Sequence, residues 1–97
     1  MPKTYYVYIM ASHKNGTTYI GVTNDIILRS TNHREGKGSI FTKNNRVHGL
    51  VYYESYADVR DAIVREKQMK KWNRQWKINL IEKDNPEWRD LWFDLNR

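Results

Sequence analysis

Apolar and polar residues alternate along the first part of the chain, as they do in paired β-strands. Residues 5–11 are mostly β-branched or aromatic, which predicts a strand that is partly buried on both faces. One face carries Tyr6, Tyr8 and Met10, and the other carries Tyr5, Val7 and Ile9. The dipeptide Asn15-Gly16 favours a type I′ hairpin turn, because both residues accept positive φ. Residues 18–23 are therefore expected to return as a second, antiparallel strand.

A helix and then a loop are expected after the second strand. Thr23 or Asn24 can cap the helix, with Asp25 placed favourably in its first turn. Apolar residues 26–28 supply its packing contacts, and the helix is expected to end at about position 34. The following residues, 36–46, are polar and basic and contain glycine, which predicts a mobile surface loop.

The second half of the chain predicts one more strand and then a long helical region. In residues 47–54 the alternation is expected to set Leu50, Tyr52 and Glu54 on one face against Val51 and Tyr53 on the other. Ser55 or Asp58 would cap the helical region. Apolar residues then recur at three- and four-residue steps, which marks an inward stripe of Val59, Ala62, Ile63, Met69, Trp72, Trp76 and Leu80.

The helical region is longer than most globular helices, so a break is expected near residues 72–73. The tripeptide Asn85-Pro86-Glu87 combines a cap, a proline and an acid, which predicts another helix that runs to about residue 95. A chain of 97 residues is expected to form one domain. Its core would cover about residues 5–82, with a helical tail at 83–97.

Charge and composition narrow the classes of function. Lys and Arg number 17 against 11 Asp and Glu, and the resulting net charge of +6 would attract polyanions such as nucleic acid. There is no cysteine, which excludes a disulfide framework, a thiolate nucleophile and a Cys-based zinc site. No apolar run approaches the roughly 18 residues of a membrane span, and the N-terminus lacks a signal-peptide core. We therefore expect a cytoplasmic protein that does not bind membranes.

One acidic residue lies where the helical pattern expects apolar ones. Glu66 falls on the inward stripe, within one helical step of Ala62 and Met69. A buried, unpaired carboxylate is costly, so Glu66 should face a cation, a metal ion or several hydrogen-bond donors. A structural ion pair with an arginine would also satisfy it.

Four further residues could belong to a functional site, but each also has an ordinary structural interpretation. Tyr8 and Tyr19 would be ordinary as amphipathic sheet residues whose hydroxyls reach the surface. Arg29 and His33 are four apart on one helix face, where an exposed cation and a C-terminal histidine are common. The ordinary interpretations leave open why two strands, a helix and an inward acid would present complementary groups together.

Two tripeptides resemble the words that name the GIY-YIG nuclease family. Tyr6-Val7-Tyr8 stands where the family has Gly-Ile-Tyr, so Tyr6 replaces the glycine. Tyr19-Ile20-Gly21 is the Tyr-Ile-Gly itself. Glycine permits backbone angles and close approaches that tyrosine does not, so the replacement bears on the local geometry rather than on the reacting groups.

Three more positions extend the resemblance. Arg29 follows at the family's spacing, His33 comes one turn later, and Glu66 lies in a downstream helix. The likeness covers about residues 5–82, and the segment 77–88 resembles the small stand-alone branch of the family in particular.

The resemblance implies a fold and a chemistry. The fold would be of the α+β class, a three-stranded antiparallel sheet flanked by helices. The activity would be that of an endonuclease that cuts phosphodiester bonds in nucleic acid, DNA favoured over RNA, in repair or recombination. Its cofactor would be Mg²⁺ or Mn²⁺ on Glu66, the metal ligand, with most of the remaining ligands supplied by water and phosphate.

The implied catalytic residues are Tyr8, Tyr19, Arg29, His33 and Glu66. Arg29 would bind phosphate oxygens through its planar guanidinium group. Tyr8 or Tyr19 would activate the attacking water, directly or through the other tyrosine. His33 would assist proton movement or hold the phosphate, because its unperturbed pKa near 6.5 permits either role.

Contacts with nucleic acid are expected to be mainly electrostatic. The residues best suited to bind phosphates are Lys37, Lys43, Arg46 and Lys70. Without an appended recognition domain, sequence specificity would require a homodimer or a protein partner.

Two other functions fit the same sequence. The first is a catalytically silent nucleic-acid binding module with the same fold, which the loss of the glycine at Tyr6 makes credible. The second is a protein-interaction subunit, whose contact surface would include Trp88 and Trp92.

Overall fold

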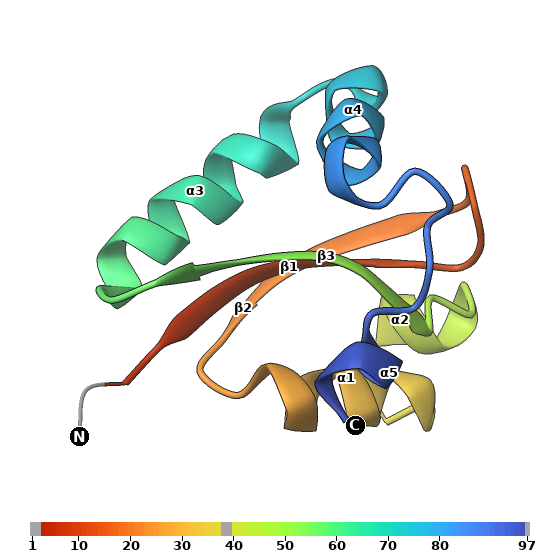
Figure 1. Ribbon diagram of the computed structural model, residues 1–97, viewed down its shortest axis with the longest axis horizontal. Coiled ribbons are helices and arrows are strands. Elements are labelled where there is room, and N and C mark those ends of the chain that lie inside the picture. Colours follow the sequence, from red (N-terminus) through yellow and green to blue (C-terminus); the bar gives the residue numbers. More distant parts are fainter. Residues whose placement is uncertain (1–2, 38–39, 97) are drawn as a thin grey trace.

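The computed structural model, which describes residues 3–37 and 40–96, has an α+β fold (Figure 1). A three-stranded antiparallel sheet has the order β2-β1-β3. The strands are β1 (Tyr5–Ala11), β2 (Thr18–Thr23) and β3 (Gly49–Tyr56). The helices are α1 (Ile26–Arg34), α2 (Ile40–Asn44), α3 (Val59–Lys71), α4 (Arg74–Asp84) and α5 (Trp92–Leu95). The predicted fold class is confirmed.

The sheet separates two layers of helices (Figure 1). Helices α3 and α4 cover one face, here called the α3 face, and α1, α2 and α5 lie on the other, the α1 face. The central strand β1 contributes Val7 and Ile9 to the core of the α3 face, and Tyr8 and Met10 to that of the α1 face. The predicted division of this strand between two buried faces is correct.

The hairpin between β1 and β2 is confirmed, but its predicted turn type is wrong. Asn15 has a φ of 61°, whereas Gly16 does not have the positive φ that a type I′ turn requires. Six residues, 12–17, join the strands, so the turn is not restricted to a two-residue geometry. Arg74 of α4 donates to the carbonyl oxygens of Asn15 and Gly16, at 2.5 and 2.8 Å, and fixes the turn against that helix.

Helix α1 has the predicted extent but a different cap. Asp25 is the N-cap, because its Oδ1 accepts a hydrogen bond from Leu28 N at 3.0 Å. The hydroxyl of Thr23 instead accepts from the backbone N–H of Asp25. The loop predicted at 36–46 is also wrong in part, because residues 40–44 form α2.

Strand β3 begins and ends two residues later than predicted, and it contains a bulge at Val51. Tyr52 pairs with Ile9, but the next residue of β1, Met10, pairs with Leu50. Leu50 therefore packs in the α1-face core, whereas Val51 and Tyr52 both pack on the α3 face. The strict alternation predicted for residues 50–54 is wrong for this reason.

The helical region breaks where predicted, with Asp58 and Asn73 as the N-caps of α3 and α4. Its predicted stripe is right at Ala62 and Met69, which are fully buried. Three other stripe residues are exposed to different degrees, namely Val59 at 36%, Ile63 at 39% and Trp76 at 56%. Trp72 and Leu80, also predicted for the stripe, are partly buried and pack against the α3-face core, as do Ile78 and Ile81 of α4.

The helix predicted to start at Asn85 does not form. Asn85 ends α4, and its buried amide donates to the carbonyl oxygens of Val51 and Arg89, at 3.0 and 2.9 Å. The last helix begins only at Trp92, although its end at Leu95 matches the prediction. The helices within 3–37 and 40–96 lack the combination of length and apolar character that crossing a membrane requires.

Candidate active site

The phenol of Tyr8 lies over Gly21 on the neighbouring strand. The two residues are direct partners in the register of β1 and β2. A Cβ atom at position 21 would lie 2.5 Å from Tyr8 Oη and 2.6 Å from Tyr8 Cζ, well inside van der Waals contact. Tyr8 can keep this orientation only while position 21 is glycine, which gives the last residue of the Tyr-Ile-Gly motif a steric role.

His33 joins Tyr8 to helix α2 through its two ring nitrogens. Nε2 lies 3.3 Å from Tyr8 Oη, and Nδ1 lies 3.1 Å from Thr42 Oγ1. All three side chains are buried, with at most 2% of each residue exposed. When the phenol donates to Nε2, Nδ1 carries the ring proton and donates to Thr42. The contacts therefore suit a neutral imidazole that can receive a proton from Tyr8.

Tyr19 packs against both members of this pair and is itself partly exposed. Its ring centroid lies 5.5 Å from that of His33 and 6.4 Å from that of Tyr8, distances typical of interacting aromatic rings. The two predicted tyrosines and His33 are thus brought together, with Tyr19 nearest to solvent.

Burial determines the ionisation of Tyr8. Removal from water raises the pKa of its phenol well above the ordinary value of 10.0, because the charged form loses hydration. The nearby Tyr19 and Glu66 raise this pKa further, and Arg29 opposes them. Tyr8 is consequently a neutral phenol at pH 7, and a free phenolate is disfavoured.

The pKa of His33 moves in the opposite direction. Burial lowers it below the ordinary value of 6.5, and the charges of Arg29 and His48 lower it further. His33 is therefore neutral at pH 7 and able to accept a proton. Arg29 is exposed on α1, one turn before His33, and its charge reaches both members of the Tyr8–His33 pair.

Glu66 approaches from the opposite face of the sheet. It lies on α3, whose neighbouring residue Met69 packs in the α3-face core, whereas Tyr8 packs in the α1-face core. The Glu66 side chain is 17% exposed, and its Oε2 lies 2.8 Å from Lys70 Nζ. The partner is thus a lysine one turn away rather than the arginine considered from sequence. The charge of Glu66 still raises the pKa of Tyr8, so the two groups interact although their elements pack on opposite faces of the sheet.

These residues could bind a divalent metal ion only if water and substrate supplied most of its ligands. Within 3–37 and 40–96, no group of three or more His, Asp or Glu side chains is arranged to hold one. The described contacts of Glu66 comprise one ion pair, with Lys70, which leaves most of the acceptor sites of the carboxylate available. Mg²⁺ keeps several waters and often uses one or two carboxylates plus phosphate oxygens, so a single glutamate is compatible with it.

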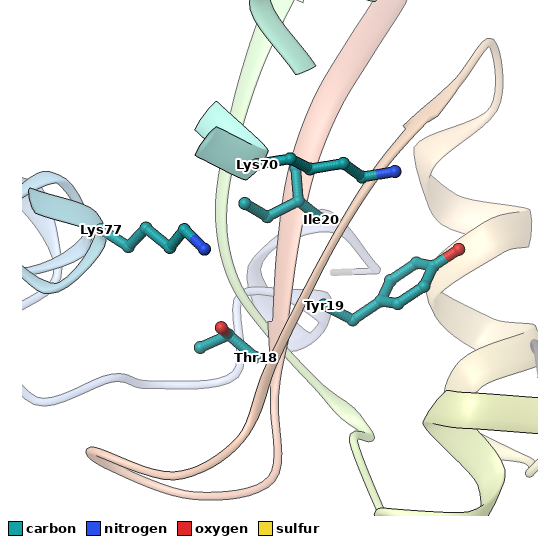
Figure 2. A pocket seen from close by; sticks show the side chains of 5 residues that line it. All are labelled: Thr18, Tyr19, Ile20, Lys70 and Lys77. Atoms are coloured by element: carbon teal, nitrogen blue, oxygen red, sulfur yellow. The ribbon is translucent and has the colours of Figure 1, made fainter. Parts of the chain in front are cut away.

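A pocket of about 300 Å³ opens beside Tyr19 at the edge of the sheet. It is lined by Thr18, Tyr19, Ile20, Lys70 and Lys77 (Figure 2). In Figure 2 the side chain of Lys70 extends toward β2, and its amino end overlaps that strand in this view. The pocket therefore brings Lys70 of α3 together with Tyr19 of β2.

The four basic residues predicted to bind phosphate are distributed over both layers. Lys37, Lys43 and Arg46 are exposed. Lys37 follows α1, Lys43 lies in α2, Arg46 follows α2, and Lys70 lies on α3. Lys37 lies 3.9 Å from Glu35, an exposed contact that leaves its ammonium largely hydrated.

Three residues near the site were not found from sequence. Thr42, the partner of His33, lay in a segment that was expected to be a loop. His48 donates from Nδ1 to the carbonyl oxygen of His33 at 2.7 Å and so secures the end of α1. Asp90 forms an ion pair with Arg34 and accepts from Leu50 N at 3.1 Å. No local pattern marks these residues, because each acts through a partner distant in sequence.

Comparison with known families agrees with this geometry. The family model described as GIY-YIG catalytic domain matches residues 4–79. The chain belongs to the GIY-YIG family. The matched range contains the three strands, the Tyr8–His33 pair and Glu66, and it ends within α4. The chain therefore has a nuclease-like domain of the GIY-YIG type.

Relatives of similar size carry the name UPF0213. A UPF0213 protein of Staphylococcus haemolyticus is 37% identical over 78 residues, which cover 80% of this chain and 94% of that protein. One from Lacticaseibacillus paracasei is 34% identical over 87 residues, 90% and 97% of the two chains. The solution NMR structure of the UPF0213 protein BH0048 from Bacillus halodurans superposes with a TM-score of 0.55 at 28% identity, covering 90% of this chain and 92% of that one.

Tyr6 takes the place of the family's first glycine without a change in the strand. It pairs with Thr23 on β2 and with Ser55 on β3, as a residue in the middle of a central strand should. It is not among the described residues with positive φ, and its ring packs against Tyr53 at 6.0 Å in an edge-to-face arrangement. Position 6 therefore needs no glycine-specific backbone geometry in this chain.

Proposed function

We propose that this protein is a divalent-metal-dependent endonuclease that hydrolyses phosphodiester bonds in nucleic acid, with DNA favoured as substrate and repair or recombination as its setting. The observation that carries the proposal is the buried contact of 3.3 Å between Tyr8 Oη and His33 Nε2. It joins a phenol that resists free ionisation to a neutral base that can take its proton.

In the proposed reaction Tyr8 is the general base and His33 receives its proton. The attacking water gives a proton to Tyr8 Oη while the phenolic proton passes to His33 Nε2. The resulting hydroxide attacks phosphorus, and the bond from phosphorus to the leaving oxygen breaks. Because the two transfers occur together, a free phenolate with its unfavourable ionisation is never formed.

Thr42 and Tyr19 would support this transfer. The hydroxyl of Thr42 would accept a hydrogen bond from Nδ1–H of His33 and keep Nε2 directed at Tyr8. Tyr19, which lines the pocket and contacts both rings, would position the attacking water. Tyr8 is almost fully buried, so this water would be an ordered one held within the site.

Arg29 would bind the phosphate that is cut. Its guanidinium offers paired donors to two phosphate oxygens and offsets the charge that grows in the transition state. The same charge lowers the pKa of His33 in the free protein. A bound phosphate would compensate for Arg29, so that His33 holds its proton more readily once substrate is present.

Glu66 would hold Mg²⁺ or Mn²⁺ from the other side of β2. When bound, the metal would stabilise the leaving oxygen as a Lewis acid. The phosphate would then lie across the edge strand, between Arg29 on the α1 face and Glu66 on the α3 face. Lys37, Lys43 and Arg46 would bind the phosphates of the remaining strand, with a homodimer or protein partner to supply specificity.

Strand cleavage tests the proposal. Purified protein with Mg²⁺ or Mn²⁺ should nick supercoiled plasmid or branched DNA, and EDTA should stop the reaction. Glu66→Ala and Arg29→Ala should each lower the rate about 100-fold or more at saturating DNA. A preparation that leaves every DNA and RNA form intact, with Glu66→Ala indistinguishable from wild type, contradicts it.

The second candidate is a nucleic-acid binding module without cleavage. The ion pair between Glu66 and Lys70 favours it, because that pair neutralises the one carboxylate assigned to the metal. Such a module would bind nucleic acid in a salt-dependent way and leave no products. Its affinity would survive both Arg29→Ala and Glu66→Ala.

A further inference from the structure

We propose that the pocket beside Tyr19 binds the phosphate of a nucleotide next to the one that is cut, and that Lys70 leaves Glu66 for this phosphate when the strand binds. The inference rests on the proposed function and adds to it a second phosphate site and an order of events. Substrate would arrive first, and its arrival would release the carboxylate for the metal ion.

The chemistry of the pocket lining suits an anion. Lys70 and Lys77 contribute two ammonium groups and Thr18 a hydroxyl, and none of the five lining residues is acidic. Among the described residues Lys77 has no ion-pair partner, so its charge is available to a ligand. Two point charges beside a hydroxyl match a phosphate, which accepts hydrogen bonds on several oxygens.

The size and place of the pocket suit a polymer rather than a separate small molecule. A volume of about 300 Å³ is at the lower limit for small-molecule sites. The pocket lies along β2, the edge strand, and shares Tyr19 with the Tyr8–His33 site. A strand whose cut phosphate lies near Arg29 and Tyr8 could thus continue past Tyr19 and place its next phosphate between the two lysines.

Lys70 belongs both to this pocket and to the carboxylate assigned to the metal. Its ammonium lies 2.8 Å from Glu66 Oε2, and its side chain lines the pocket. In the free protein it neutralises Glu66 and competes with any cation for it. The Lys70 side chain is 51% exposed, so it can turn toward a phosphate without disturbing the core. Phosphate and metal binding are then coupled through one side chain.

The first experiment measures phosphate binding without metal. Affinity for a fluorescent DNA oligonucleotide is followed by anisotropy in EDTA over a range of salt concentrations. Lys70→Ala and Lys77→Ala should each weaken binding about 3- to 10-fold and reduce the salt slope by about 1. Lys83→Ala is the control, because it removes an exposed charge from α4 outside the pocket. Equal effects of all three variants would overturn the pocket as a phosphate site.

A parallel titration with inorganic phosphate separates a strand phosphate from the free ion. The proposal expects the oligonucleotide to shift the amide resonances of Thr18 and Tyr19, and inorganic phosphate to do so only weakly. Saturation by inorganic phosphate, with oligonucleotide affinity unchanged in Lys77→Ala, would overturn it.

The second experiment measures metal binding without substrate. The concentration of free Mn²⁺ is measured by electron paramagnetic resonance as Mn²⁺ is titrated into the protein without nucleic acid. Lys70→Ala and Lys70→Gln should bind Mn²⁺ about threefold more tightly than wild type, because the competing cation is gone. Lys71→Ala, which removes the adjacent exposed charge, should match wild type. Equal affinity in wild type and Lys70→Ala would overturn the exchange.

These results remain distinct from a failure of the proposed function. Wild type that neither binds nor cuts nucleic acid contradicts the proposed function itself. Wild type that cuts DNA, with Lys70 and Lys77 variants that behave like Lys83→Ala, contradicts this inference alone.

Discussion

Tyr8 and Gly21 face each other across β1 and β2, and the phenol of Tyr8 occupies the space that a side chain at position 21 would need. This relationship connects the two tripeptides that name the family. The glycine of the second makes room for the tyrosine of the first, which in turn reaches His33.

Gly21→Ala should therefore abolish the proposed cleavage without unfolding the protein. The added methyl group would force the Tyr8 phenol away from His33, since a Cβ there would lie 2.5 Å from Oη. We expect cleavage to fall about 100-fold, with a circular dichroism spectrum like that of wild type. Gly49→Ala is the matched control, because a Cβ there meets its nearest atom at 3.4 Å. Equal activity in the two variants would remove the steric role of Gly21.

Thr42 should act as a positioning residue for His33. Thr42→Val removes the partner of Nδ1 at nearly constant volume, so the ring can adopt the other tautomer and Nε2 no longer accepts from Tyr8. We expect the cleavage rate to fall about 10-fold at saturating DNA, and Thr42→Ser to restore most of it. Nitrogen-15 NMR of the imidazole reports the tautomer directly. A purely structural role for Thr42 would leave the tautomer of His33 unchanged.

The lowered pKa of His33 predicts the acid limb of the pH profile. Because burial and the charges of Arg29 and His48 lower this pKa, the imidazole stays neutral at pH values where an ordinary histidine is charged. At subsaturating DNA, where the rate reports the free protein, cleavage should persist below pH 6.5 and decline only as the pH falls through the lowered pKa of His33.

The same shift has a consequence for stability. In the unfolded chain His33 takes up a proton near pH 6.5, whereas in the folded chain it does so only at lower pH. The free energy of unfolding should therefore decrease as the pH is lowered through that interval. Proton NMR titration of His33 provides the measurement. A midpoint at or above 6.5 contradicts both statements.

Glu54 should stabilise the packing of α3 on the sheet. It accepts hydrogen bonds from Tyr52 and Tyr56 and forms an ion pair with Arg65, 2.7 Å between Oε1 and Nε. Burial tends to raise the pKa of Glu54, but these donors outweigh burial and lower it. We expect Glu54→Gln to reduce the free energy of unfolding by about 1–3 kcal/mol in urea.

A surface glutamate provides the control for that measurement. Glu87 pairs with Lys14 at 3.6 Å where both side chains are exposed, so Glu87→Gln should change stability by at most about 0.5 kcal/mol. The Glu54 contribution should be present above pH 4.5 and be lost as the pH falls through the lowered pKa of that carboxyl. Equal stability changes in the two variants would show that the Glu54 cluster has no special role.

The sequence predicts most of the fold because the strong signals are local. Alternation in residues 5–11 and 18–23 defines the hairpin, and a helix cap at Asn73 separates two helices at the expected place. The errors arise where a distant contact decides. Asn85 looks like a helix start, but its amide is needed by the carbonyl of Val51 across 34 positions of sequence, and it ends a helix instead.

The site shows the same limit. The two motif tripeptides and the spacing along the chain are enough to predict five site residues, namely Tyr8, Tyr19, Arg29, His33 and Glu66. Spacing does not indicate that Glu66 lies on the other face from His33, or that Lys70 occupies its carboxylate. Thr42 could not be nominated, because its role depends on α2 folding against His33 rather than on any pattern around residue 42.

The central claim is that Glu66 and the Tyr8–His33 pair form one metal-dependent site across β2. Anomalous scattering from crystals that contain a DNA oligonucleotide and Mn²⁺ tests it most directly, with a phosphorothioate at the cut position to slow cleavage. We expect one Mn²⁺ peak at the Glu66 carboxylate, the cut phosphate between this ion and Arg29, and Lys70 turned toward the neighbouring phosphate. DNA bound elsewhere, with Lys70 still on Glu66 and no ion beside the carboxylate, would contradict the account.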